Sequence, residues 1–348
     1  MKKGFALVMA SMMALSLTAC GGNGSSATTA ADTSAADTKA EGTTAAAPAD
    51  KIGLAGSGKE LIFTTGGDQG TYYGFGSVLA GQISDMTDTT VTAIVGKGSK
   101  GNIEAMDAGD AQLGFVQSDV MAYAYNGTNL FDGAKVDGFS TVAALYMEQV
   151  QIVTLNPDIK TVADLKGKTV SVGDSGSGVY FNALDCLGAY GLTIDDITPT
   201  YQSFGDSVEA MQDGKIDAAF IVAGAPTTAV TSLAATRKVY LVELDDEHID
   251  KLIEASPYYS KYTIAKDAYG LEKDATTVAV SAVVIAQDDV DENDIYNFVA
   301  GIYDSIDTLG HDKKNELDLD FAASVTAVPY HKGAAKYFAE KGLTVPTK

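Results

Sequence analysis

The sequence contains few histidines and cysteines, two residue types that many catalytic and metal sites use. Its three histidines are His248, His311 and His331, and none of them stands beside a nucleophile motif or in metal-ligand spacing with cysteine or another histidine. We therefore expect no enzymatic activity and no metal site built from these residues. The histidines are expected to be solvated or to cap helices.

Positive charge is also scarce. The formal net charge is -22, which argues against nucleic acid and against broad contact with anionic lipid. Arg237 is the only arginine, and its A-A-T-R-K-V context indicates a surface turn. A two-pronged arginine clamp for an anion is therefore not expected, and an anion would have to be held by local hydrogen-bond donors.

Only two cysteines are present, Cys20 and Cys186. Lys2 and Lys3 precede an apolar run that ends in Leu17-Thr18-Ala19-Cys20, which predicts a lipoprotein signal peptide over residues 1–19 with lipidation of Cys20. The protein is then extracytoplasmic and lipid-anchored to the membrane, at the cell surface or in the periplasm. An uncleaved anchor or a secreted soluble protein is the alternative. Cys186 is left without a partner, and its helical context predicts a buried core cysteine.

A long segment without apolar periodicity follows the signal. Residues 20–58 are mostly Gly, Ser, Thr and Ala, a composition that cannot bury a core. We expect a disordered tether there, and a folded part of two lobes after it.

A glycine-rich loop occurs twice between an apolar strand and an amphipathic helix. The first copy, Thr64 to Ser77, reads T-T-G-G-D-Q-G-T-Y-Y-G-F-G-S, with its helix expected over Ser77 to Asp85. The second, Val172 to Asn182, reads V-G-D-S-G-S-G-V-Y-F-N. Glycines allow the backbone to approach a guest, and N-H groups at a helix start attract negative charge. The pattern predicts a small anionic ligand.

A second repeat accompanies the first. Asn102 to Val116 and Ser207 to Ile221 share Glu-Ala-Met, a later glycine and a phenylalanine, which predicts a helix closed by Gly109 or Gly214 and then a buried strand. Two related α/β units with a ligand between them follow from this layout. Two units packed rigidly without a ligand are the alternative.

Polar residues follow the strand of the first unit directly, at Gln117, Ser118 and Asp119. Such positions lie at the ligand crevice of an open sheet, although Ser118 or Asp119 could instead cap the next helix. Val222 to Thr228 is their counterpart in the second unit.

Two long β-like runs, Thr141 to Leu155 and Thr277 to Ala286, flank the second unit and predict a hinge between the lobes. The expected boundaries are 59–147 with 279–348 for lobe 1, and 148–278 for lobe 2. Glu148 on the first run could reach a ligand or form a salt bridge within the hinge.

The motifs together resemble the TAXI family of solute receptors for tripartite ATP-independent periplasmic (TRAP) transporters, over nearly all of the mature domain. The resemblance rests on I-F-T-T-G-G-x-x-G-T-Y-Y, G-F-V-Q-S-D, V-A-D-L-K-G-K-x-V-S-V-G-x-S-G-S-G, Y-Q-S-F-G-D, A-G-A-P and P-Y-H-K-G-A. It implies an α/β, type II periplasmic-binding-protein fold with two lobes of mixed sheets joined by two hinge strands.

The resemblance also implies a function: the lobes close over a small carboxylate or amino acid, such as glutamate, glutamine or 2-oxoglutarate, and deliver it to a TRAP membrane permease. It implies ligand-binding positions at Thr65, Gly66, Gly67, Thr71, Tyr72, Gln117, Ser118, Asp119, Ser175, Gly176, Ser177, Gly178, Gly224 and Pro226. The chain departs from the family pattern at Asp68 and Gly74. Asp68 could repel an acidic guest or bind an amino group.

The residues themselves indicate how a carboxylate would be held. Backbone N-H groups of the loops and the hydroxyls of Thr65, Thr71, Ser175 and Ser177 are the available donors, and Lys97 is either a further cation or a solvated loop lysine. The repeat pairs Tyr72 with Tyr180, which we place at the cleft.

The glycine loops lack the Gly-Lys-Ser/Thr of a nucleotide site, so no cofactor is expected. We expect a monomer. Presentation of the ligand to a sensor kinase or to an ATP-driven permease is the alternative role.

Overall fold

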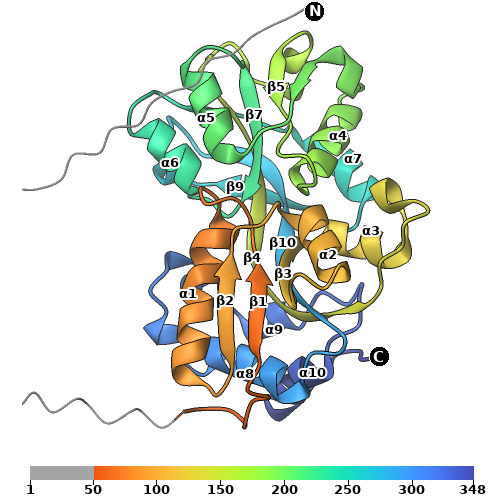
Figure 1. Cartoon of the computed structure of the whole chain (residues 1–348). Coiled ribbons are helices and arrows are strands. Elements are labelled where there is room, and N and C mark those ends of the chain that lie inside the picture. Colours follow the sequence, from red (N-terminus) through yellow and green to blue (C-terminus); the bar gives the residue numbers. More distant parts are fainter. Residues whose placement is uncertain (1–50) are drawn as a thin grey trace, which may run out of the picture. The chain divides into compact units, whose positions relative to one another are not determined.

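The computed structural model describes residues 51–348, which hold one large sheet with helices on both faces (Figure 1). The predicted signal peptide (1–19), Cys20 and most of the tether lie outside the described residues. Among residues 51–348, no helix is both long and apolar enough to cross a membrane.

Lobe 1, the lower half of Figure 1, is built from both ends of the described chain. Its strands are β1 (Glu60–Thr64), β2 (Thr90–Ile94) and β3 (Leu113–Gln117). Its helices are α1 (Thr71–Met86), α2 (Ser99–Asp107), α3 (Ser118–Asn126), α8 (Glu292–Tyr303), α9 (Leu319–Ala322) and α10 (Lys332–Glu340), with 3-10 turns η1 (Asn129–Phe131), η5 (Ile306–Thr308) and η6 (Asp312–Glu316).

Lobe 2, the upper half, comes from the middle of the chain. Its strands are β5 (Thr169–Ser171), β6 (Thr198–Thr200), β7 (Ala218–Ala223), β8 (Tyr240–Val242) and β9 (Ser260–Ile264). Its helices are α4 (Val179–Ala189), α5 (Phe204–Gln212), α6 (Thr228–Ala234) and α7 (Asp246–Ala255), with 3-10 turns η2 (Val162–Leu165), η3 (Ile194–Asp196) and η4 (Lys266–Ala268).

Two long antiparallel strands, β4 (Phe139–Thr154) and β10 (Ala275–Gln287), run through both lobes. The strand order is β2-β1-β3-β10-β4-β7-β5-β6, with β8 also paired to β4 and β9 to β10. β4 pairs with β10 as far as Gln149 and with β7 from Gln149 onward, so it changes partner there. The two predicted hinge runs are therefore confirmed as strands. Because β4 and β10 continue from one lobe into the other, no break in the chain marks a boundary at 147/148 or 278/279. These two boundaries stay predictions.

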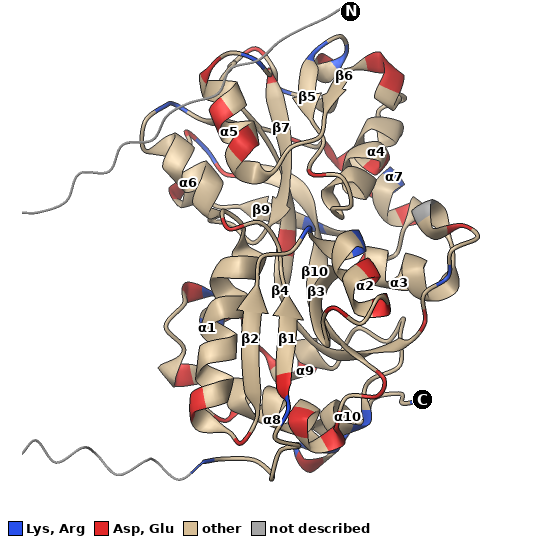
Figure 2. Ribbon diagram, viewed as in Figure 1, with Lys and Arg blue, Asp and Glu red and all other residues tan. Residues whose placement is uncertain are grey.

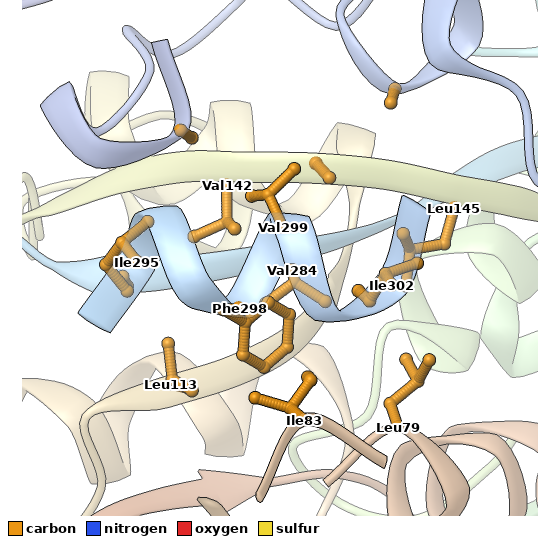
Figure 3. Close-up of a cluster of buried hydrophobic side chains, with 14 of the residues drawn as sticks. Leu79, Ile83, Leu113, Val142, Leu145, Val284, Ile295, Phe298, Val299 and Ile302 are labelled. Carbon is orange, nitrogen blue, oxygen red and sulfur yellow. The ribbon is translucent and has the colours of Figure 1, made fainter. Parts of the chain in front are cut away.

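The core of lobe 1 has two layers. On one face, Leu79 and Ile83 of α1 meet Ile295, Phe298 and other apolar residues of α8 over the sheet, as Figure 3 shows. α2 and α3 cover the opposite face. Each helix presents its apolar side chains three or four residues apart, the spacing that places them on one side.

Lobe 2 repeats this arrangement. α4 and α7 cover one face of its strands and α5 and α6 the other. Cys186 of α4 is completely buried among them, and burial raises the pKa of its thiol, so the prediction of a core cysteine is confirmed. Acidic side chains lie on helices of both lobes (Figure 2).

The helix-glycine-strand repeat is confirmed. α2 and α5 each end with a glycine at positive φ, Gly109 (φ 82) and Gly214 (φ 70). In both, the next residue's N-H bonds back into the helix: Asp110 to the carbonyl of Ala105, and Lys215 to that of Ala210, each at 2.8–2.9 Å. This is the glycine closure predicted from the sequence.

Two predictions are wrong in detail. α1 begins at Thr71, six residues before the expected start at Ser77. The buried series Tyr72, Phe75 and Leu79 supports the earlier turns, and glycine at 76 is required because a Cβ there would lie 2.9 Å from the Thr65 side chain. The glycines thus serve packing inside a helix as well as the loop.

The predicted tether ends too late. Ile52 forms a bridge with Thr87, Leu54 N-H donates to Asn297 Oδ1 at 2.6 Å, and Ser57 N-H donates to Asp294 Oδ1 at 3.2 Å. Residues 52–57 therefore belong to the folded part, because α8 offers polar side chains that pair their backbone.

Candidate ligand-binding site

A cavity of about 70 Å³ lies between the two lobes. Lobe 1 contributes Gly66 to Tyr72, Gly96 to Ser99 and Gln117, and the hinge strand β4 contributes Glu148. Lobe 2 contributes a second group of residues: Asp174, Ser177, Gly178, Val179, Ser203, Phe204, Gly205, Val222 and Ala223. As predicted, the two glycine loops meet at one place, the wall of this cavity.

The N-termini of five helices meet at this cavity. The N-cap residues of α1, α2, α3, α4 and α5 all line it, and these are Gly70, Gly98, Gln117, Gly178 and Ser203. The three glycines have no side chain with which to bond the first N-H groups of their helices. Those groups and the positive ends of the helix dipoles therefore favour an anion in the cavity.

One hydroxyl in the wall has no partner. Ser177 is 7% exposed, and its Oγ has no hydrogen bond within residues 51–348. A buried hydroxyl without a partner costs free energy, which a bound solute could recover. Lys97 is the one lysine among the lining residues.

The structure places half of the predicted site residues in the wall. These are Gly66, Gly67, Asp68, Thr71, Tyr72, Gln117, Ser177 and Gly178. That they bind a solute stays a prediction.

The other predicted residues lie nearby without lining the cavity. Thr65 is buried and its hydroxyl donates to the carbonyl of Ile94 at 2.7 Å. Tyr180 packs against Tyr201, with ring centroids 5.7 Å apart. The remainder, Ser118, Asp119, Ser175, Gly176, Gly224 and Pro226, are also outside the lining set.

Neither Ser118 nor Asp119 caps α3, whose N-cap is Gln117. Ser118 instead accepts a bond from Ser281 N-H at 3.2 Å, and Asp119 is fully buried. Capping of α3 by either residue is therefore wrong, and neither lines the cavity; that they lie beside a bound ligand stays a prediction.

Several wall residues were not predicted from the sequence, notably Ser203, Phe204 and Asp174. The Y-Q-S-F-G-D motif contains the first two and could have revealed them, because Ser203 caps a helix whose start faces the cavity. Asp174 stands inside the second glycine loop.

Glu148 is the most unusual wall residue. It is 2% exposed, and its Oε2 accepts a bond from Tyr72 Oη at 2.6 Å. Within residues 51–348 it forms no ion pair, so the alternative of a hinge salt bridge is wrong. Burial raises the pKa of Glu148 to about 8.

A polar network connects the lobes beside the cavity. Asn182 of α4 accepts a bond from Gln117 Nε2 at 2.8 Å and donates to Asp119 Oδ2 at 3.0 Å and to Tyr259 Oη at 2.8 Å. Tyr259 in turn donates to Asp185 at 2.8 Å. Asn182 therefore links two lobe 1 side chains to lobe 2.

Further hydrogen bonds also join the lobes. Thr71 Oγ1 donates to the carbonyl of Gly224 at 2.9 Å, and Gly101 N-H donates to that of Gly176 at 2.9 Å. Lys313 of η6 is 4% exposed, pairs with Glu316, and donates to the carbonyl of Ala225 at 2.9 Å. The structure is thus a closed arrangement.

The buried acids predict a pH dependence. Burial raises the pKa of Asp119 to about 7, and that of Glu148 to about 8. Both acids ionise near pH 4 when unfolded, so the stability from keeping them neutral is full below pH 4 and is lost as pH rises through 7 and 8. Between pH 6.5 and 8, Asp119 alone should lower the unfolding free energy by about 1 kcal/mol.

Denaturant unfolding at pH 6.5 and 8 tests this, with Asp119→Asn as the comparison. This pH range avoids the titration of His311 and His331, whose pKa values are lowered by burial. Protonation of these histidines below pH 6.5 would lower the stability as pH falls, which is opposite to the effect of the buried carboxyl groups. The pH slope should be smaller in Asp119→Asn, and an equal slope in both proteins would contradict the assignment.

The histidines have the expected structural roles. His311 and His331 are the N-caps of η6 and α10, and each accepts a backbone N-H bond through its ring. His248 contacts Asp245 at 2.7 Å on an exposed helix end. Among residues 51–348, no group of three or more His, Cys, Asp or Glu side chains is placed to hold a metal ion.

Two α/β lobes on a shared sheet, joined by two crossing strands and enclosing a small cavity, form a type II periplasmic-binding-protein fold. The profile of the NMT1-like family matches residues 63–342. This chain belongs to the NMT1-like family.

A curated relative is named as a candidate aliphatic sulfonates-binding protein of Escherichia coli (strain K12). It is 43% identical over 70 residues, which are 20% of this chain and 22% of the relative, so the match spans about a fifth of either protein.

Solved structures match this chain at low sequence identity. The periplasmic aliphatic sulphonate binding protein SsuA of Escherichia coli is 18% identical, with a TM-score of 0.43 over 80% of this chain and 78% of that one. PhnD1 of Prochlorococcus marinus, solved with methylphosphonate, is 13% identical, with a TM-score of 0.48 over 76% of this chain and 89% of that one.

Proposed function

We propose that the protein is an extracytoplasmic, lipid-anchored receptor that closes its lobes over a small carboxylate or amino acid and delivers it to a TRAP-type membrane permease. The observation that carries the proposal is the cavity between the lobes, lined by the N-termini of five helices. N-terminal N-H groups suit a carboxylate, and this chain has no arginine in the cavity wall.

The permease class rests on the motifs shared with the TAXI family, several of which lie at the cavity. The segments T-T-G-G-D-Q-G-T-Y-Y, G-S-G and Y-Q-S-F-G-D all contribute wall residues. Delivery to an ATP-driven permease or to a sensor kinase is the alternative, and the protein acts as a monomer in either case.

An anionic sulfonate head is a second candidate ligand group, because the curated relative from Escherichia coli is named for aliphatic sulfonates. Helix N-termini and hydroxyls such as that of Ser177 recognise sulfonate and carboxylate oxygens alike. The test therefore includes both.

A thermal melting screen tests the proposal. The purified protein, unfolded and refolded to remove carried-over ligand, is melted with glutamate, glutamine, 2-oxoglutarate, other dicarboxylates, branched-chain acids and aliphatic sulfonates. A true ligand at a hundred times its dissociation constant should stabilise the protein by about 2.7 kcal/mol. The melting temperature should then rise by roughly 5 °C or more. No shift with any of these compounds would contradict the proposed ligand class.

A further inference from the structure

The charges in the cavity wall do not suit a plain anion. Three carboxyl groups, Asp68, Asp174 and Glu148, line it, against one cation, Lys97. The helix N-termini supply donors for an anionic group, yet Asp68 and Asp174 would repel a solute that carried negative charge alone, and so would Glu148 whenever it is ionised. A solute with both signs of charge satisfies both parts of the wall.

Glu148 is the carboxyl that most needs a positive partner. Its side chain is nearly completely buried, and in the described part of the chain its Oε1 has no hydrogen-bond partner. The Tyr72 hydroxyl bonds only Oε2 and holds the group in place at the cavity. A buried carboxylate without a cation is costly, so the group must hold a proton or meet a cation.

The neighbours of Glu148 do not supply that cation. Lys313 attracts Glu148 weakly from a distance, while its ammonium group bonds Glu316 and the Ala225 carbonyl. Asp119 adds a repulsive negative charge, and the facing hydroxyls of Tyr72 and Tyr146 are neutral, their pKa values being raised by burial. The remaining place for a cation is the cavity itself.

We propose that Glu148, held by Tyr72, binds a protonated amino group of the solute and thereby selects amine-bearing anions over their amine-free analogues. The inference rests on the proposed function and refines its ligand class. The solute's anionic group then lies at the helix N-termini and its ammonium group replaces the proton on Glu148. The small volume of the cavity lets one solute reach both.

Matched ligand pairs test this directly. Calorimetric titration compares glutamate with glutarate, and taurine with ethanesulfonate, in the wild-type protein, in Glu148→Gln and in Glu209→Gln, an exposed glutamate of α5. In the wild type and in Glu209→Gln, the amine-bearing member of the pair that binds should bind at least about tenfold more tightly. In Glu148→Gln that preference should fall to about twofold or less.

Each contrary result has a separate meaning. An amine-free analogue that binds the wild type as tightly as its amine-bearing partner overturns the role of Glu148 and leaves the receptor intact. An equal loss for both members in Glu148→Gln also overturns it, since the residue is then only structural. If none of the four compounds binds the wild type, the inference fails, and the melting screen decides separately whether the proposed function fails with it. The wild-type comparison decides the matter even if Glu148→Gln does not fold.

Discussion

Replacing Asn182 with leucine is expected to weaken binding of the solute identified by the melting screen by about a hundredfold. Leucine has a similar size but makes none of the three hydrogen bonds by which Asn182 joins Gln117, Asp119 and Tyr259. Asp119 Oδ1 already has no partner in the described residues, so the closed form would bury a carboxyl group with little compensation. At pH 8, above the pKa of about 7 that burial gives Asp119, this carboxyl is ionised, and binding is compared at that pH. Removing one partner of a buried charge costs about 3 to 5 kcal/mol, and 1.4 kcal/mol is tenfold in affinity.

The substitution should destabilise mainly the closed form, because opening the lobes returns Asp119 to water. We therefore expect Asn182→Leu to have a larger radius of gyration in solution scattering with the solute present, whereas the wild type compacts. Asn315→Leu, at an exposed asparagine of η6, is the control and should bind normally. Wild-type affinity in Asn182→Leu would show that the network does not stabilise the closed form.

Replacing Gly333 with alanine is expected to lower the unfolding free energy by about 3 kcal/mol or more. Gly333 lies at the start of α10, where a Cβ would stand 2.1 Å from the Glu292 carbonyl oxygen and 2.8 Å from the Tyr296 nitrogen. Both are backbone atoms of α8, which cannot rotate away as a side chain does. The two helices must separate, and overpacking of this kind is among the costlier core changes.

Thermal melting measures the effect, which should be a drop of about 6 °C or more. Gly81→Ala is the matched control, because Gly81 lies in the middle of α1 with no atom within 4 Å of the added Cβ. Alanine should there stabilise the helix by about 0.5 to 1 kcal/mol. If Gly333→Ala had the same melting temperature as the wild type, α8 and α10 would have to pack more loosely than the structure shows.

The architecture was predictable because its signals are local and repeated. Apolar runs gave β1, β3, β4 and β10 to within a few residues, and the glycine closures at Gly109 and Gly214 follow from backbone geometry that an L-residue seldom adopts. The start of α1 was missed because glycine is read as a helix breaker. At position 76, however, a Cβ would lie 2.9 Å from the Thr65 side chain, so glycine fits there inside the helix. This contact is visible only in the folded lobe.

The site was only half predictable for a similar reason. The glycine loops mark the cavity, since their sequence fixes both a turn and a helix start. Asp119 bonds Asn182 and does not line the cavity, and this choice depends on how the two lobes meet. No sequence pattern within one segment encodes the way in which the lobes meet. The free oxygen of Glu148 and the missing partner of Ser177 likewise emerge only when both lobes are in place.

The path of the chain through the sheet sets an order for biosynthesis. The strands from β4 to β10 and the elements between them are contiguous in sequence, so lobe 2 can assemble as soon as Gln287 has left the ribosome or the membrane channel. Lobe 1 cannot, because β10 stands between β3 and β4 in its sheet and α8 and α10, which cover it, come later still. Until then β3 and β4 present unpaired edges, which makes the early half of lobe 1 the part of the nascent chain most exposed to aggregation and most in need of a chaperone.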